Sequence, residues 1–359
     1  MRVVQVINHS GTNFGGAERL ATTLHQDLLD AGVDAHILAI GACEVGDMPR
    51  SHSLGFKSVR DPRVVLTLRA ALRDLVRPGT VVHAHLFPAT LHVSALRQTG
   101  QLATPCSMTE HSTWNRRREH PALRGLDRMV YRGFERIAAI STQTQDALLS
   151  TYPALRPRTE IIRNGATLRF ATPPEHPSDQ TPCILTVARL APVKNIANAL
   201  RALAKLTDRP WRYVVAGGGE EEGNLKRLAA ELGITERVTF LGQVADVTPL
   251  LTEAHIFLLP SRWEGFGLAA VEGMNAALPI VASDVPGLRE IVVPAGNPVV
   301  DSDDVEGMAT AIAALLDDPD RRTRLGAAGF EEAMQYDRKK MNEGYMTLWS
   351  EIVAKRIIT

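Results

Sequence analysis

The chain has 359 residues, of which 45% are hydrophobic and 22% charged, and its 40 Lys and Arg balance 40 Asp and Glu. This composition excludes a disordered chain and a histone-like protein whose whole surface neutralises phosphates. No segment approaches the roughly 18 uninterrupted apolar residues of a membrane span, and 5% aromatic residues are too few for the stacking platforms of a single-strand nucleic-acid binder. Three widely spaced cysteines fit neither a disulfide framework nor a metal site. We therefore expect a soluble, cytoplasmic protein of two domains without a nucleic-acid partner.

Short β-branched runs alternate with longer amphipathic runs along the first half, which is the pattern of parallel strands joined by helices. The predicted strands cover residues 3–8, 35–40, 81–85, 107–110, 137–140 and 160–162. They are apolar on both faces, as strands that helices cover on both sides should be. After Gly16, the spacing of Leu20, Leu24 and Leu28 predicts a helix with one buried stripe.

The second half repeats this scheme, with strands predicted at 184–187, 213–216, 238–241, 256–259 and 280–282. Between the halves, residues 171–182 contain four prolines and no apolar periodicity, which indicates a linker. We therefore expect an α/β protein with two Rossmann-like, doubly wound domains that face a cleft. The predicted boundaries are 1–168 for the first domain, 169–182 for the linker and 183–335 for the second domain. A last helix within 336–359 could cap either domain, including by packing back on the first.

In open parallel sheets, ligands bind beyond the carboxyl ends of the strands, so the loops there are the places to search. The most informative loop follows strand 256–259, where Gly265 and Gly267 allow close backbone approach and a helix start presents free N–H groups to an anion. Glu264 lies at this turn, and Glu272 lies eight residues on, inside the helix. Carboxylates beside an anion site suit the recognition of sugar hydroxyls. The alternative is a helix-dipole role for Glu264 and a solvated position for Glu272.

Two further loops follow strands of the second half. Arg189 and Lys194 come after strand 184–187, where they could clamp a diphosphate, as a divalent metal does elsewhere, or simply be solvated. No cluster of Asp or His with metal-ligand spacing lies nearby. Gly217 and Gly218 follow strand 213–216 and are either part of a nucleotide loop, although the GxGxxG spacing is absent, or a tight strand-to-helix turn.

The order of these motifs resembles that of retaining GT-B glycosyltransferases of the GT4 type. In the second half, the resemblance rests on VARLAPVKN, VVAGGGE and EGFGLAAVE, the last of which carries the E-x7-E pattern of Glu264 and Glu272. In the first half, GGAE at 15–18, HAH at 83–85, TEH at 109–111, IS at 140–141 and RNG at 163–165 match the same family in order. The resemblance covers nearly the whole chain. One departure is Asn-Ala-Ala at 275–277, where the family commonly has Cys-Gly, and it falls at a packing position.

The resemblance implies roles for these residues. Glu272 would bind the nucleotide ribose, Glu264 would contact hydroxyls of the donor sugar, and Arg189 with Lys194 would stabilise the diphosphate. His111 would lie by the transferred sugar, which makes Arg189, Lys194, Glu264 and His111 the expected catalytic set. The other expected donor-binding residues are Gly15, Gly16, Gly217, Gly218, Gly242, Gly265, Phe266, Gly267 and Leu268, and backbone near 242–246 would hold the base. We expect no metal and no other cofactor, because Arg189 and Lys194 supply the positive charge.

Residues around His111 are candidates for the acceptor side. They are His85, Trp114, Asn115 and Arg116. Residues 116–136 contain seven arginines, which we call the cationic strip. Arg116, Arg117 and Arg118 are consecutive, and Arg124, Arg128, Arg132 and Arg136 are four apart, which predicts a helix with a cationic face. Residues 1–165 carry a net charge of +6 and residues 166–359 carry −6. The strip could be a solvated helix face, or it could attract anionic phospholipid or a diphosphate-linked lipid acceptor at the inner face of the membrane.

The main hypothesis is a retaining, metal-independent hexosyltransferase. It would move a hexose or N-acetylhexosamine from a nucleotide diphosphate sugar, a UDP-sugar in preference to a GDP-sugar, to a glycan or lipid-linked acceptor, as in cell-surface polysaccharide synthesis. The resemblance implies a front-face substitution in which the departing phosphate takes the proton of the acceptor. The alternatives are a sugar-nucleotide epimerase on the same scaffold and a non-catalytic subunit that binds sugar nucleotides. The presence of Glu264, Glu272, Arg189 and Lys194 together weighs against the subunit.

Overall fold

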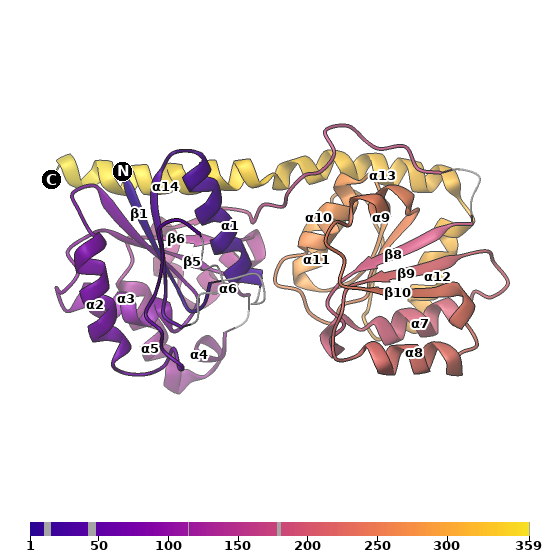
Figure 1. Ribbon diagram of the computed structural model, residues 1–359, viewed down its shortest axis with the longest axis horizontal. Coiled ribbons are helices and arrows are strands. Elements are labelled where there is room, and N and C mark those ends of the chain that lie inside the picture. The colour runs from indigo at the N-terminus through magenta and orange to yellow at the C-terminus, as the bar shows by residue number, and fades with distance from the viewer. Residues whose placement is uncertain (11–15, 42–47, 114, 178–180, 359) are drawn as a thin grey trace. The chain divides into compact units, whose positions relative to one another are not determined.

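The computed structural model describes residues 1–10, 16–41, 48–113, 115–177 and 181–358 (Figure 1). The chain forms two compact units. The first contains Met1–Asn164 and Lys339–Thr359, and the second contains Gly165–Arg338. Each unit has its own parallel sheet and its own apolar core.

The first unit is built on a seven-stranded parallel sheet with the strand order β3-β2-β1-β4-β5-β6-β7. Its strands are β1 (Arg2–Ile7), β2 (Asp34–Ala39), β3 (Ser51–Ser53), β4 (Thr80–His85), β5 (Cys106–Glu110), β6 (Arg136–Ala139) and β7 (Thr159–Ile161). The strand order reverses between β1 and β4, which is the switch point where doubly wound sheets bind their ligands. Every residue of β4 and β5 is buried, including the polar residues of these strands.

Helices cover both faces of this sheet (Figure 1). One apolar cluster joins Val4 and Val6 of β1 to α2 (Val64–Leu75), α3 (Ala89–Gln98), α5 (Arg124–Arg132) and α6 (Thr142–Thr151). Another cluster joins Val3 to α1 (Gly16–Asp30) and the C-terminal helix α14 (Arg338–Ile358). Because neighbouring residues of a strand point to opposite faces, the two clusters lie on opposite sides of the sheet. The short helix α4 (Arg116–Glu119) precedes α5.

The second unit has a six-stranded parallel sheet with the order β10-β9-β8-β11-β12-β13. Its strands are β8 (Cys183–Val187), β9 (Arg212–Ala216), β10 (Val238–Gly242), β11 (Ile256–Leu259), β12 (Ile280–Ser283) and β13 (Val299–Val300). One face packs on α7 (Ile196–Ala204), α8 (Glu222–Glu231) and α12 (Val305–Leu316). The other face packs on α9 (Thr248–Glu253), α10 (Leu268–Asn275), α11 (Pro286–Val292) and α13 (Pro319–Ala333).

The predicted α/β architecture with two doubly wound sheets is confirmed. Each predicted strand is present, with its ends displaced by at most one residue. The sequence does not predict β3 and β13, which are only three and two residues long. Strands this short and this incompletely buried leave too few alternating positions for a pattern to be recognised.

The segment predicted as a linker, residues 169–182, belongs to the second unit in its described part. The backbone N–H groups of Arg169 and Phe170 donate to Oδ1 of Asn275 at 2.7 and 3.0 Å. Phe170 also packs against the apolar core of that unit. A proline-rich segment without periodicity can still be held by backbone hydrogen bonds, and a hydrophobicity pattern does not reveal them.

Arg136 does not lie on the helix where the sequence predicts it. Helix α5 ends at Arg132 with Gly133 as its C-cap, and Arg136 begins β6. Gly133 packs so closely on Ser94 of α3 that a Cβ would collide with it. The guanidinium of Arg136 instead pairs with Glu351 of α14 at 3.0 Å, so it does not extend the cationic strip.

Candidate functional site

Four loops of the second unit leave the same edge of its sheet. Strands β9, β8, β11 and β12 are hydrogen-bonded neighbours in this order and run parallel, so their carboxyl ends lie side by side. The first three of these loops carry Gly217, then Arg189 with Lys194, and then Glu264, and the fourth leads into α11, which begins with Pro286 and Gly287. Motifs that are far apart in the sequence therefore gather at one edge.

Lys194 and Glu264 form an ion pair between two of these loops. Nζ of Lys194 donates to Oε1 of Glu264 at 2.6 Å, and the hydroxyl of Ser261 donates to the same oxygen at 2.9 Å. The side chains of Lys194 and Glu264 are 23% and 14% exposed, so the pair is partly shielded from water. An ammonium has three hydrogens, and one of them points to Glu264. Lys194 can therefore bind an anion while it holds Glu264.

The role of Ser261 is not predicted from the sequence. The signal present in the sequence is the S-x-x-E spacing of Ser261 and Glu264 after a strand. At a helix start this spacing lets each of the two side chains bond a backbone N–H group. Here the hydroxyl orients the carboxylate itself.

Asn195 fixes the loop that carries Lys194. Its φ of 56° lies in the left-handed region, which Asn tolerates better than most residues. Its Nδ2 donates to the carbonyl of Pro260 at 3.0 Å and to that of Ser302 at 2.8 Å, which joins the loops after β8, β11 and β13. The N–H of Arg262 donates to the carbonyl of Val193 at 2.8 Å. The sequence alone does not reveal this role, although Asn195 ends the VARLAPVKN motif.

Arg189 is more exposed than Lys194. Its side chain is 69% exposed, and Nη1 lies 4.0 Å from Oε2 of Glu220. Such an exposed pair contributes little to stability, so the guanidinium can turn to a ligand at small cost. The glycine loop after β9 packs on the loop of Arg189: a Cβ on Gly217 or Gly219 would collide with the backbone of Ala188 or Leu190. Gly217, whose φ is 137°, is therefore required by this packing.

The turn before α10 is held by backbone contacts. Gly267 is the N-cap of α10, and its N–H donates to the carbonyl of Gly287 at 3.1 Å. A Cβ on Gly287 would collide with the backbone of Glu264. The loops after β11 and β12 therefore pack backbone to backbone, and this packing fixes the place of Glu264.

The remaining residues predicted to bind the donor lie around this turn and on the neighbouring loops. Gly265, Phe266 and Leu268 are half-buried, and the ring of Phe266 packs on that of Tyr336 with 5.7 Å between centroids. Glu272 is half-buried in α10. Gly218 is half-buried on the loop after β9, and Gly242 ends β10 with a φ of 67°.

In the first unit, His85 ends β4 and His111 follows the neighbouring strand β5. Nδ1 of His85 lies 3.1 Å from Nε2 of His111, and Nε2 of His85 lies 3.0 Å from Oε1 of Gln5. Burial lowers the pKa of His111 to about 4, and burial together with the nearby His83 and His111 holds the pKa of His85 well below its ordinary value. Both rings are therefore neutral at pH 7. A neutral His111 can exchange hydrogen bonds with a sugar, but it does not act as a charged acid.

The other predicted residues of the first unit have different surroundings. Gly16 is exposed at the start of α1, whereas Gly15 and Trp114 lie outside the described residues. Asn115 is buried and caps α4, since its side chain accepts the N–H of Arg117 at 2.9 Å. Arg116 is exposed on α4.

Two arginines counted in the cationic strip are occupied by buried carboxylates. Nη2 of Arg118 donates to Oε2 of Glu110 at 3.1 Å, and both side chains are buried. Nε of Arg117 donates to Oδ1 of the fully buried Asp127 at 2.9 Å. These arginines hold the loop after β5 against α5. The exposed arginines of the strip are Arg116, Arg124, Arg128 and Arg132.

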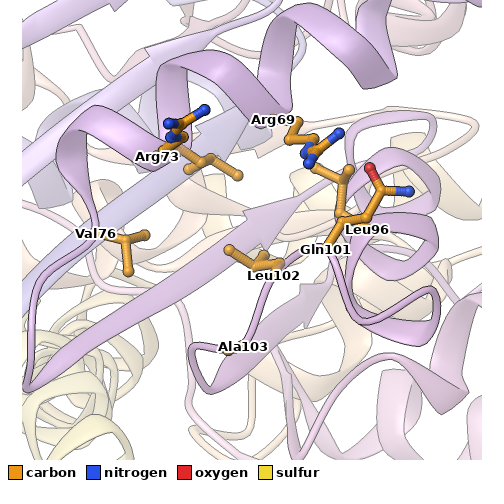
Figure 2. A pocket seen from close by; sticks show the side chains of 8 residues that line it. Arg69, Arg73, Val76, Leu96, Gln101, Leu102 and Ala103 are labelled. Carbon is orange, nitrogen blue, oxygen red and sulfur yellow. The ribbon is translucent and has the colours of Figure 1, made fainter.

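A groove of about 280 Å³ lies at the opposite edge of the first sheet. Figure 2 shows Arg69 and Arg73 of α2 near Leu96, Gln101 and Leu102. The groove adjoins the residues that lead into β4 and β5, whereas His85 and His111 lie at the ends of these strands. None of the predicted site residues lines it.

Neither a metal-ligand cluster nor a membrane-spanning helix is found in the part of the chain that the structure describes. No group of three or more His, Cys, Asp and Glu among the described residues could hold a metal ion. No helix within the same residues is long and apolar enough to cross a bilayer.

Two of the relatives that match most of the chain are mannosyltransferases. The chain is 28% identical over 307 residues to the GDP-mannose-dependent monoacylated alpha-(1-6)-phosphatidylinositol monomannoside mannosyltransferase of Corynebacterium glutamicum, a match that covers 77% of this chain and 79% of that protein. It is also 28% identical over 319 residues to the lipopolysaccharide core biosynthesis mannosyltransferase LpsB of Rhizobium meliloti, with 78% and 84% covered. Among solved structures, Anabaena Alr3699/HepE in complex with UDP matches with a TM-score of 0.80 and 17% identity over 98% of this chain and 100% of that one, which shows the fold.

Two family models match the two halves of the chain. Residues 14–170 match the model described as Glycosyltransferase Family 4, and residues 169–332 match the model described as Glycosyl transferases group 1. The first match ends and the second begins where the chain enters the second unit. The chain therefore belongs to the GT4-type glycosyltransferases and has the GT-B fold.

Proposed function

We propose that the protein is a retaining, metal-independent hexosyltransferase that takes a hexose or N-acetylhexosamine from a nucleotide diphosphate sugar. The observation that carries the proposal is the pair of Lys194 and Glu264 at the carboxyl edge of the second sheet. Arg189 is exposed in the same loop, five residues before Lys194. One loop thus presents two cations to a diphosphate, and a carboxylate held by one of them is available to the sugar.

The ammonium of Lys194 can bond Glu264 and a phosphate at the same time. This arrangement suits a diphosphate sugar, because its phosphates and its sugar are adjacent. Lys194 would keep its bond to Glu264 and give its other hydrogens to phosphate oxygens. Glu264 would accept hydrogen bonds from sugar hydroxyls through its second oxygen. Glu272 would bind the ribose, and the N-terminus of α10 would face the diphosphate.

The proposed mechanism needs no protein nucleophile. Arg189 and Lys194 stabilise the negative charge that develops on the leaving diphosphate, where preorganised cations have their largest effect. The departing phosphate oxygen takes the proton of the acceptor hydroxyl, which attacks the anomeric carbon on the same face. His111, neutral at pH 7, hydrogen-bonds the transferred sugar and does not carry the proton.

The proposed donor is a UDP-sugar, and GDP-mannose is a second candidate. The complex of Anabaena Alr3699/HepE with UDP supports the first, since that protein has the same fold. The name of the Corynebacterium glutamicum relative, a GDP-mannose-dependent enzyme, supports the second.

The proposed acceptor is a glycan attached to a lipid, reached at the inner face of the membrane. The names of the two relatives, which act on a phosphatidylinositol monomannoside and in lipopolysaccharide core biosynthesis, support this class. The exposed Arg124, Arg128 and Arg132 of α5 would attract its anionic groups.

A panel of UDP- and GDP-sugars tests the proposal. The correct donor should raise the melting temperature, because a ligand of the folded state stabilises it by mass action. With a glycolipid acceptor it should release the nucleoside diphosphate, and NMR of the product should show the anomeric configuration of the donor retained. An inverted product contradicts the mechanism. An epimerised nucleotide sugar formed without acceptor would indicate the epimerase, and binding without turnover would indicate the binding subunit.

A further inference from the structure

Two histidines of β4 belong to separate hydrogen-bond chains. His83 and His85 are fully buried, and their rings meet edge to face with 4.6 Å between centroids. His85 lies between Gln5 and His111 and touches both through ring nitrogens. His83 is hydrogen-bonded to other residues, so among the described side chains it is His85 that links the buried part of the sheet to the histidine proposed to contact the sugar.

Gln5 decides which nitrogen of His85 carries the proton. Oε1 of Gln5 can only accept, so Nε2 of His85, 3.0 Å away, carries the hydrogen. A neutral imidazole has one N–H group, so Nδ1 of His85 is an acceptor. Burial favours this neutral form by lowering the pKa of His85.

The tautomer of His85 in turn determines that of His111. The partner of Nδ1 of His85 is Nε2 of His111 at 3.1 Å, and this nitrogen must donate. His111 is neutral as well, so its Nδ1 carries no hydrogen. Among the described residues, the ring of His111 is hydrogen-bonded through Nε2, and the half-buried ring leaves Nδ1 available to a ligand.

We infer that Gln5 and His85 are positioning residues that hold His111 as the Nε2–H tautomer, so that its Nδ1 accepts a hydrogen bond from a hydroxyl of the transferred sugar. The inference rests on the proposed function, which places His111 at that sugar. It assigns the direction of the hydrogen bond and names the residues that set it. Neither Gln5 nor His85 touches the substrate in this arrangement.

His83 supplies the matched control. It lies on the same strand as His85 and is equally buried. Its Nδ1 lies 3.3 Å from the indole nitrogen of Trp349, which can only donate, and its Nε2 lies 2.8 Å from the hydroxyl of Thr109. Its Nδ1 also lies 2.7 Å from the hydroxyl of Ser107, so its contacts lead to β5 and α14. A substitution at His83 therefore perturbs the same buried region without changing the partner of His111.

The variants His85→Asn and His85→Gln separate positioning from packing. The amide of Asn takes the place of Nδ1 and reaches His111, whereas the amide of Gln takes the place of Nε2 and reaches Gln5. We expect His85→Asn to keep kcat within about threefold of wild type and His85→Gln to lose about tenfold, the effect of one hydrogen bond on a rate. The donor KM should change little in either. His83→Gln should lower the melting temperature and leave kcat near that of wild type. Equal kcat values for the two His85 variants would overturn the inference.

A measurement on the wild-type protein does not depend on activity or on the folding of a variant. With ¹⁵N-labelled histidine, ring nitrogen shifts distinguish the two tautomers, and the spectrum of His111→Gln identifies the signals of His111. We expect its Nδ1 to be unprotonated. A protonated Nδ1, which a rotated Gln5 amide would produce, overturns the inference whether or not sugar is transferred. If no nucleotide sugar is turned over but Nδ1 is unprotonated, the proposed function fails and the assigned positions of the protons stand.

Discussion

At the scale of single residues, Lys194 is the side chain whose surroundings say most about chemistry. It is only 23% exposed and bonds a carboxylate that Ser261 also holds. The desolvation of both charges is partly offset by their short contact, and removal of one partner leaves the other incompletely paired. This geometry holds the ammonium in place before a ligand arrives, which is the property a charge stabiliser needs.

Lys194→Ala should lower kcat/KM by roughly 100-fold, because the charge on the leaving diphosphate is largest in the transition state. Steady-state kinetics with the identified donor checks this. Lys205→Ala is the matched control, because Lys205 also pairs with a carboxylate, Glu306 at 2.5 Å, but at the surface, where both partners are well exposed. The control should keep wild-type kinetics. Wild-type turnover of Lys194→Ala would move the diphosphate away from this loop.

The two glutamates should differ in what they bind. Glu272→Ala should weaken the binding of the bare nucleoside diphosphate, because its proposed partner is the ribose. Glu264→Ala should spare that binding and impair use of the intact donor, because its proposed partner is the sugar. Calorimetry with UDP and GDP checks the first effect, and kinetics checks the second. Equal losses of nucleotide affinity in both variants would contradict the division of roles.

The sequence could identify residues that lie in motifs, and it could not identify those that act through distant partners. Glu264 and Lys194 lie in the segments that come after strands, and their charge makes them stand out. Asn195 and Gln5 are ordinary polar residues until the fold brings Pro260 and His85 to their side chains. A buried amide has no pattern of its own, so its role becomes visible only with its partner.

At the scale of the elements, α5 shows why a periodic charge pattern is only a partial guide. The spacing of its arginines is helical as far as Arg132, and Gly133 then ends the helix where it meets α3. Arg117 and Arg118, which the sequence places among the same cations, are paired with buried carboxylates. Ion pairs with buried carboxylates thus give some arginines of the strip a structural role, whereas Arg124, Arg128 and Arg132 stay exposed.

Neutralising the exposed arginines of α5 tests whether they attract anionic lipid. Replacing Arg124, Arg128 and Arg132 by Gln should reduce sedimentation with anionic vesicles, and high salt should reduce the difference by screening. A triple change at Arg227, Arg321 and Arg324, which are exposed on α8 and α13 of the second unit, removes the same charge elsewhere and should have no effect. If both triple variants bind vesicles as wild type does, the strip is a solvated face.

The histidines in β4 and directly after β5 should make stability depend on pH. Burial lowers the pKa of His83 to about 3 and that of His111 to about 4, from an ordinary value of 6.5. Below about pH 6.5 the unfolded chain binds protons that the folded chain does not. The free energy of unfolding therefore decreases as the pH is lowered. The melting temperature should be level above pH 7 and should fall between pH 6.5 and 4. Calorimetry at constant ionic strength checks this, and His85→Asn should show a shallower fall. A level melting temperature through this window would mean that the rings are charged in the folded protein.

At the scale of the whole molecule, the two doubly wound sheets were predictable because each buried parallel strand is a separate apolar run. The exact boundaries between the units could not be predicted from the sequence, because they depend on packing. Asn164 and Gly165 belong to different units, and no change of composition marks the step. The charge difference between the two halves follows from the sequence. The charge exposed at the surface depends on which arginines form ion pairs with carboxylates in the folded protein.

The effect of metal removal on activity distinguishes two ways to stabilise the leaving diphosphate, namely the cations Arg189 and Lys194 or a bound divalent metal ion. If Arg189 and Lys194 stabilise the leaving diphosphate, a strong chelator should leave kcat/KM within about twofold of the untreated value, since no divalent ion supplies the charge. Added Mg²⁺ or Mn²⁺ should also fail to restore Lys194→Ala, because Glu264 and Ser261 alone do not make a metal site. Activity lost in EDTA and restored by metal would assign the charge to a bound ion. Partial restoration of Lys194→Ala by Mg²⁺ with an EDTA-resistant wild type would show that the ammonium occupies the place a metal takes in other transferases.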